Sequence, residues 1–215
     1  MSAKKKFEFA SNIVIFLCLV VSIILIFIYS GKGEQALVAN GFESFKFFTV
    51  LSNVFMGITA FISLLYIKKE APTWLLILKY LATCTVALTL LTVMLYLGPV
   101  YGYIILLQYA NAFMHLIIPV LAIFHLILLE PKLEQYKFIY VIYSVIPMLL
   151  YGIAYMINVT ANNGYGNVKY DWYFFCQWGL GIGVVAFLVM IVFAFLIGLA
   201  LYFAYIKIQI KKGSE

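Results

Sequence analysis

The sequence predicts an all-α polytopic membrane protein that folds as a single six-helix transmembrane domain over residues 1–215. Composition is the first reason: 66% of the residues are hydrophobic and only 10% are charged, whereas soluble domains carry about 25% charged residues. The second reason is that apolar runs of about 20 residues recur along the chain, and a helix of that length crosses the hydrocarbon core of a bilayer. A soluble protein of this composition would have no polar surface left to face water.

Charged and proline-containing segments divide the apolar sequence into six expected helices. The first apolar run follows three lysines at positions 4–6. Because this run is long and no small-residue cleavage pattern follows it, we expect a retained helix and not a signal peptide. Segments 68–72, 98–102 and 130–132 each contain a proline, which interrupts helical hydrogen bonding. The expected helices cover residues 12–30, 44–67, 73–97, 104–129, 136–157 and 176–206.

The basic residues, all of them lysine, predict the orientation of these helices. With the N-terminus inside, ten of the 14 lysines fall in inner segments and three fall in outer segments (Lys32, Lys46 and Lys169); Lys79 lies at the inner end of the third helix. Lysine accumulates on the cytoplasmic side of membrane proteins, so we expect both termini inside (N-in/C-in). The lysines flank spans instead of forming one basic patch, so the net charge of +6 predicts no nucleic-acid partner.

A stripe of polar residues runs through the second expected helix. Phe45, Thr49 and Asn53 are spaced i, i+4 and i+8, close to one helix face, and Ser52 lies beside them. Aromatic and aliphatic side chains cover the other faces. Because lipid cannot satisfy hydrogen bonds, this stripe must face protein or enclosed water.

The fourth expected helix carries a second stripe, made of Gln108, Asn111 and His115. An ionisable residue deep in a span is costly and is therefore a functional candidate. A water-poor environment favours the neutral imidazole, which suits a general base; the alternative is a structural histidine bonded between helices. His125 lies nearer the inner surface, where a structural role is expected. Counted from the outer helix ends, Asn53 and Asn111 are level, so we expect the second and fourth helices to be neighbours.

The cysteines and the loop 158–175 give two further predictions. Cys18, Cys84 and Cys176 have no paired spacing, and zinc-binding and Gly-x-Ser-x-Gly patterns are absent from the sequence; we therefore expect no metal, disulfide or cofactor. The loop 158–175 ends in a run of aromatic residues that is typical of an interfacial belt. The alternative interpretation of this loop is a lid over an outward-facing cavity.

Two motifs resemble a known family. The segments 47–53 (FFTVLSN) and 114–120 (MHLIIPV) are similar to motifs of the androgen-inducible membrane hydrolases and their bacterial relatives. The likeness extends to the number of spans, to the Glu130-Pro131 pair and to the aromatic loop before the last helix. It implies a multi-pass threonine hydrolase in a bacterial inner (plasma) membrane, with Thr49 as nucleophile and His115 as base. The implied substrates are fatty-acid esters of hydroxy fatty acids, so the expected partner is a membrane lipid or another acyl-chain ligand.

The residues themselves are compatible with this chemistry. A threonine hydroxyl is a weak nucleophile unless a base accepts its proton, and Asn53, Asn111 or Gln108 could orient that base or donate to an oxyanion. Asp171 is the only aspartate and lies in the outer loop, so a dyad is the simpler expectation; whether Asp171 or the loop takes part stays open. The alternatives are a small-molecule transporter or channel and a non-catalytic lipid-binding protein. Transport is disfavoured because no Asp or Glu is expected inside a span and no inverted repeat is evident.

Overall fold

The computed structural model describes residues 3–29, 41–129 and 137–213. Every regular element within these ranges is helical. Six helical stretches are long and apolar enough to cross a membrane, which confirms the predicted all-α, six-span class of integral membrane protein. These spans are Lys4–Ile28, Phe48–Leu65, Thr73–Val100, Ala110–Leu129, Ile139–Ala161 and Leu180–Ile208.

Several spans are built from more than one helical segment. The first, second and sixth spans are α1 (Ala3–Ile28), α2 (Phe48–Leu65), which follows the 3-10 helix η1 (Gly41–Lys46), and α10 (Leu180–Gly213). The third consists of α3 (Thr73–Thr92), the π-helix η2 (Val93–Leu97) and α4 (Gly98–Tyr101). After α5 (Tyr103–Leu106), the fourth span joins α6 (Ala110–Ala112), η3 (Phe113–Ile117), α7 (Ile118–Phe124) and η4 (His125–Leu129), and the fifth joins α8 (Ile139–Tyr143) to α9 (Ile146–Ala161).

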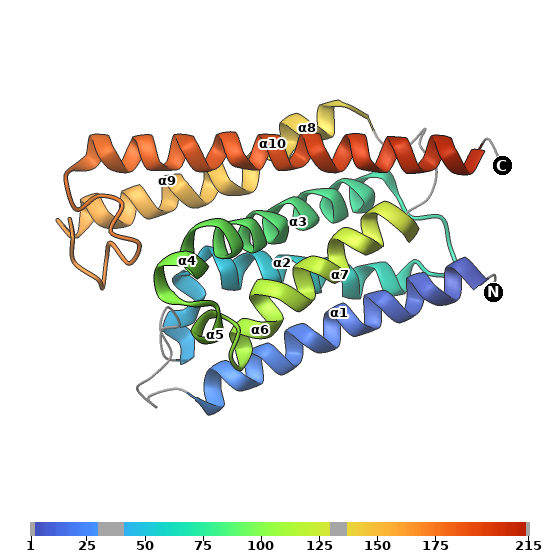
Figure 1. Cartoon of the computed structure of the whole chain (residues 1–215), viewed down its shortest axis with the longest axis horizontal. Coiled ribbons are helices and arrows are strands. Elements are labelled where there is room, and N and C mark those ends of the chain that lie inside the picture. The colour runs from blue at the N-terminus through green and yellow to red at the C-terminus, as the bar shows by residue number, and fades with distance from the viewer. Residues whose placement is uncertain (1–2, 30–40, 130–136, 214–215) are drawn as a thin grey trace.

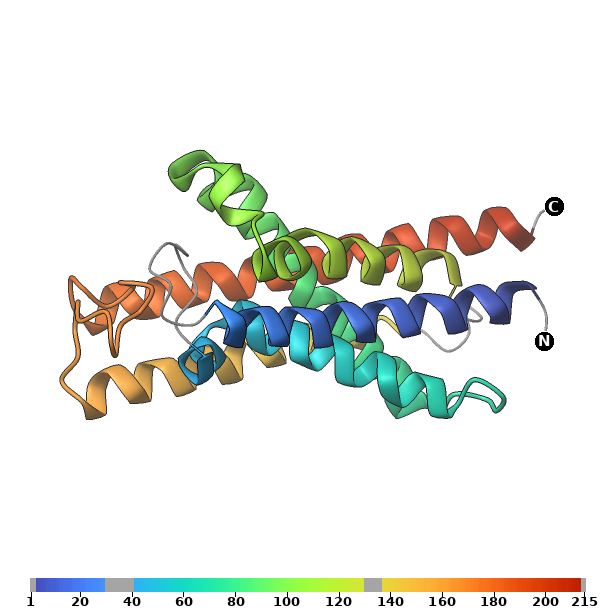
Figure 2. The ribbon, with the colours of Figure 1, turned by 90° about the horizontal axis from the view of Figure 1, so that it is seen from below.

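The spans form a bundle around α3 (Figure 1). Helices α2 and α7 pack on one side of α3, and α8, α9 and α10 on the other; α1 packs against α2 and α7. The start of α1 and the end of α10 lie at the same end of the bundle, which we call the terminal end. The opposite end carries the loop 162–179 between α9 and α10; we call it the cap end and that loop the cap loop. Figure 2 shows that α3 crosses the bundle obliquely and that α4 leans away from it.

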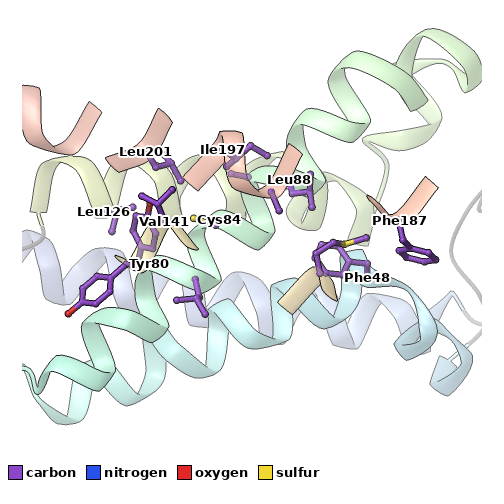
Figure 3. Close-up of a cluster of buried hydrophobic side chains, with 14 of the residues drawn as sticks. Phe48, Tyr80, Cys84, Leu88, Leu126, Val141, Phe187, Ile197 and Leu201 are labelled. Atoms are coloured by element: carbon purple, nitrogen blue, oxygen red, sulfur yellow. The ribbon is translucent and has the colours of Figure 1, made fainter. Parts of the chain in front are cut away.

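Helix α3 can occupy the centre because small and hydroxylated residues alternate around it. Ala82, Thr83, Thr85, Ala87 and Thr89 are all buried, and small side chains let neighbouring helices approach closely. The threonine hydroxyls donate to carbonyls of their own helix at 2.7–3.3 Å, so their burial leaves no unmet donor. Figure 3 shows the apolar side chains packed against this helix, from Tyr80 and Leu126 at one end of the cluster to Phe48 and Phe187 at the other.

The predicted start of the fourth helix at residue 104 is wrong. The helix begins at Ala110, and Gln108 lies in the preceding break. The break forms because Gly102 has φ +87° and Tyr109 has φ +50°, and a helix cannot continue through a positive φ. The Glu130-Pro131 pair, which entered the family resemblance, lies outside the described residues.

The first helix also starts earlier than predicted, at Ala3 instead of residue 12. Glu8 therefore lies within the first span, near its terminal end; the expectation concerned the interior of the spans.

Candidate functional site

A small cavity of about 60 Å³ lies near the cap end of the bundle, and we call it the site cavity. The side chains around it come from α1, α2, η2, α6, η3 and the cap loop. Three of the predicted site residues, Thr49, Asn111 and His115, line it together. The remaining lining residues are Ile26, Phe47, Val50, Leu97, Ala110, Met114 and Tyr173.

The two stripe-bearing helices are neighbours, as predicted. Asn53 Nδ2 donates to the carbonyl of Met114 at 3.0 Å, which joins α2 to η3 one residue before His115. The same nitrogen donates to the carbonyl of Thr49 at 2.8 Å. Asn53 therefore ties the two candidate catalytic segments to each other.

His115 occupies the middle of η3 and is buried. Its Nδ1 lies 2.7 Å from the carbonyl oxygen of Leu106. A carbonyl can only accept a hydrogen bond, so Nδ1 must carry the proton. In the neutral ring Nε2 then holds the lone pair, which is the arrangement required of a general base. A backbone carbonyl thus orients this histidine where other sites use a carboxylate.

Thr49 is the second residue of α2 and is half-buried. Its carbonyl accepts hydrogen bonds from Ser52 Oγ and Asn53 Nδ2 at 2.9 and 2.8 Å. Within the described part of the chain, its hydroxyl makes no hydrogen bond, to His115 or to any other residue. The hydrogen bond between a nucleophile and its general base is often long or absent in an unliganded enzyme and shortens only when substrate binds.

The other predicted site residues lie at different distances from the cavity. Asn111 lines it, is only 4% exposed, and its side-chain amide makes no hydrogen bond within the described ranges. Ser52 and Asn53 are buried behind the cavity wall: Ser52 Oγ lies 3.2 Å from Thr89 Oγ1 of α3. Gln108 is exposed and does not line the cavity; it was expected there because the helix was predicted to begin too early.

Tyr173 of the cap loop also lines the cavity, although no motif in the sequence marks it as a site residue. The cap loop folds inward, since the Tyr155 and Tyr173 rings stack at 5.9 Å and Tyr151 Oη accepts from Trp172 Nε1 at 3.0 Å. Burial raises the pKa of Tyr173 to about 12, against a smaller opposing effect of the hydrogen bond from Phe48 N–H. The phenol is therefore neutral at physiological pH. The run of aromatic residues before the last span was the sequence signal for this wall of the cavity.

Asp171 is fully buried inside the cap loop. It accepts from the Tyr155 hydroxyl and from the N–H groups of Gly166 and Cys176. Because these donors hold the carboxylate and His115 is bonded to Leu106, Asp171 is not an acidic partner of the histidine in this structure. Its contacts instead hold the loop together.

A second polar cluster lies at the terminal end of the bundle. Lys79, only 2% exposed, forms an ion pair with Glu8 at 3.7 Å, and its Nζ lies 3.5 Å from His125 Nε2. His125 Nδ1 is hydrogen-bonded to Ser11. This cluster joins α1, α3 and η4, and His125 has the structural contacts expected of it. In the described ranges, no three His, Cys, Asp or Glu side chains are arranged to hold a metal ion.

A cluster of apolar side chains, which we call the apolar layer, lies between the two polar regions, at a depth where Thr83 and Thr85 of α3 are also buried. Its residues lie between the terminal-end cluster and the site cavity along α1, α3 and α7, and α2 contributes to the same layer; they are Ile15, Leu19, Met56, Ala60, Ala82, Val86, Ile118 and Ala122. A larger open groove of about 600 Å³ lies between α9 and α10. Its lining includes one hydroxyl, Thr160, but no titratable side chain. The groove therefore lacks a base, and the site cavity is the stronger candidate for chemistry.

Comparison of the chain with family models, with curated proteins and with solved structures returns no match. We therefore infer function from the geometry of the site cavity and from the residues around it.

Proposed function

We propose that this protein is an intramembrane lipid-ester hydrolase in which Thr49 is the nucleophile and His115 the general base. The observation that carries the proposal is that Thr49 and His115 line the same small cavity. In addition, the Nδ1 bond to Leu106 leaves Nε2 of His115 able to accept a proton. A hydroxyl and such a base in one cavity are the minimal set of groups for nucleophilic ester cleavage. The two motifs that resemble threonine hydrolases contribute these same two residues.

In the first step, Thr49 Oγ1 attacks the ester carbonyl carbon while its proton passes to His115 Nε2. The C–O bond to the alcohol then breaks, and the departing alkoxide takes the proton from Nε2. The product of this step is an acyl ester on Thr49. In the second step a water molecule, deprotonated by His115, attacks that ester. The fatty acid leaves, the proton returns to Thr49 Oγ1, and the enzyme is restored.

Both steps pass through an oxyanion that needs hydrogen-bond donors. Asn111 is a suitable donor because its amide lines the cavity and makes no hydrogen bond to the described residues. The N-terminus of α2 also favours negative charge at this place, since the first N–H groups of a helix have no intrahelical acceptor. Thr49, as the second residue of α2, lies within that first turn.

The size and position of the cavity constrain the substrate. About 60 Å³ has room for an ester group with a few water molecules, since a single enclosed water needs about 10–15 Å³. The acyl chains would therefore remain outside the cavity, in the bilayer. With the N-in/C-in orientation proposed from the lysines, the cap end faces outward and the ester enters from the outer leaflet. Fatty-acid esters of hydroxy fatty acids, in the inner membrane of a bacterium, are the specific case that the family resemblance implies.

Transport is the second candidate function, because polar groups lie at two depths of the bundle. The ion pair of Lys79 with Glu8 in the terminal-end cluster is unusual within membrane spans and favours this interpretation. The apolar layer between that cluster and the site cavity argues against a continuous path. A lipid-binding protein without catalysis would use the cavity but would not need the proton acceptor on His115.

A fluorophosphonate probe tests the proposal because it forms a covalent bond with activated hydroxyls. We expect the full-length protein in detergent to be labelled at Thr49, as identified by mass spectrometry, and to hydrolyse 4-nitrophenyl octanoate. Thr49→Ala should lose both signals because the hydroxyl is gone, whereas Thr49→Ser should keep part of both.

The matched control is Thr92→Ala. Thr92 Oγ1 donates to the Leu88 carbonyl at 2.8 Å, and Thr92 does not line the cavity, so this variant should behave as wild type. Hydrolysis and labelling that persist at full strength in Thr49→Ala would remove Thr49 as the nucleophile. Substrate binding without turnover in the wild type would favour a lipid-binding protein instead.

A further inference from the structure

Tyr173 is bonded to the helix that carries Thr49. The N–H of Phe48, the first residue of α2, donates to Tyr173 Oη at 3.0 Å. The preceding residue, Phe47, offers no side-chain cap to the helix. Because the first N–H groups of a helix lack intrahelical acceptors, the Tyr173 hydroxyl takes the place of the usual capping serine or aspartate. Residue 173 thus stabilises the first turn of a helix 125 positions earlier in the chain.

Tyr173 is itself held by the interior of the cap loop. Its N–H donates to Tyr155 Oη at 3.1 Å, and the Tyr155 hydroxyl donates to Asp171. The carboxylate of Asp171 also accepts from Gly166 N and Cys176 N, at 2.9 and 3.1 Å. A chain of hydrogen bonds therefore runs from a buried carboxylate in the cap loop to the first turn of α2. Thr49 is the next residue of that turn.

We infer that Tyr173 is a positioning residue for Thr49: its hydroxyl fixes the first turn of α2 and so holds the Thr49 hydroxyl in place in the site cavity. This inference rests on the proposed hydrolase function. The aromatic ring of Tyr173 packs edge-on against Phe47 at 5.8 Å between ring centroids. Removing only the hydroxyl thus leaves the ring contacts of the loop intact.

Tyr173→Phe is the test variant, and Tyr165→Phe is its matched control. Tyr165 lies in the same loop, and within the described ranges its hydroxyl makes no hydrogen bond. Because a misplacement of about 1 Å can cost about 10²-fold in rate, we expect Tyr173→Phe to lower kcat and the labelling rate of Thr49 by about 10- to 100-fold. KM should change less than about twofold, since the cavity keeps its ring. Tyr165→Phe should match the wild type in all three quantities.

Hydrogen exchange of the segment 47–52 measures the contact between Tyr173 and the first turn of α2 independently of catalysis. Tyr173→Phe should speed exchange of this segment, because the Phe48 N–H loses its acceptor, while Tyr165→Phe should not. Wild-type labelling and exchange rates in Tyr173→Phe would overturn the positioning role and leave the hydrolase proposal standing. A rise in KM with unchanged kcat would also overturn it, since that result indicates a binding role. If the wild type itself is not labelled at Thr49, the hydrolase proposal and the positioning role both fail.

Discussion

The ring of His115 is oriented by a backbone carbonyl, and this choice has consequences for the chemistry. Leu106 O accepts from Nδ1 at 2.7 Å, which fixes the tautomer without adding a second charge to a water-poor site. A carboxylate in the same place would have to be desolvated, which is expensive inside a membrane. In the proposed reaction, the imidazolium would be stabilised by this carbonyl dipole alone. We therefore expect proton transfer to be slower than in a triad with a carboxylate, but the site avoids the cost of burying a second charge in the bilayer.

We predict that the losses caused by substituting Thr49 and His115 are not additive. His115→Ala should lower ester hydrolysis by about 10²- to 10⁴-fold, the usual contribution of general-base assistance. The double variant with Thr49→Ala should be hardly worse than either single variant, because groups that act as a unit lose activity together. Steady-state rates on 4-nitrophenyl octanoate measure this relation. Multiplicative losses would show that the two residues act independently and would contradict the dyad.

The helical structure of the fourth span is interrupted next to the candidate site. Its helical part starts at Ala110, and His115 lies within a π-helical segment. Such segments are rare and occur often at functional sites, because the wider turn changes the direction of a side chain. The short helix α5 precedes the span and supplies the Leu106 carbonyl to His115. The interruption of the span therefore brings the Leu106 carbonyl to the position from which it orients His115.

A substitution at Gly102 tests this arrangement, because Gly102 forms the turn into α5. Its φ of +87° and ψ of 131° are accessible to glycine only, although an added Cβ would contact nothing within 4 Å. Gly102→Ala should therefore destabilise the protein through the backbone alone, by about 1–3 kcal/mol. It should also reduce hydrolysis, since α5 holds Leu106. Unfolding in detergent and rates on 4-nitrophenyl octanoate measure the two effects.

Gly181→Ala is the matched control for this prediction. Gly181 lies in the first turn of α10, has no positive φ, and its added Cβ would also contact nothing within 4 Å. Alanine in a helix is favoured over glycine by about 0.5–1 kcal/mol, so this variant should be neutral or slightly stabilised. Equal destabilisation of both variants would show that the positive φ of Gly102 is not the cause of the effect.

For the whole molecule, the two ends of the bundle differ in charge and in construction. The terminal end carries the exposed lysines of the first span and of the loop after α2, and it encloses the Lys79 cluster. The cap end carries the aromatic loop and the site cavity. By the positive-inside rule, we expect the end with more lysine to face the cytoplasm. The proposed site would then open toward the outer leaflet.

Cysteine labelling tests this orientation. Val168 of the cap loop is 63% exposed and Lys69 at the terminal end is exposed, so both positions tolerate substitution. On intact cells, a membrane-impermeant maleimide should label Val168→Cys but not Lys69→Cys. After permeabilisation both should react. The unmodified chain controls for Cys18, Cys84 and Cys176, of which the last two are buried. Labelling of Lys69→Cys alone on intact cells would reverse the orientation and move the site to the inner leaflet.

The sequence alone determined the helical class, the six spans and the two polar faces that meet. These features follow from local patterns: an apolar run of sufficient length must be helical in lipid, and polar side chains four apart share a helix face. For this reason the second and fourth helices could be expected to be neighbours, with Asn53 and Asn111 at the same depth. The structure brings Thr49, Asn111 and His115 to the site cavity.

The tertiary structure decided the features that depend on backbone angles or on distant pairing. The break at Tyr109, with φ +50°, removed Gln108 from the fourth helix, and no residue-level preference predicts a positive φ at tyrosine. The pairing of Lys79 with Glu8 and the contact of Tyr173 with Phe48 join residues far apart in the chain. Such pairs form only after the helices have packed, because their hydrogen bonds must be satisfied by whichever groups the packing brings near.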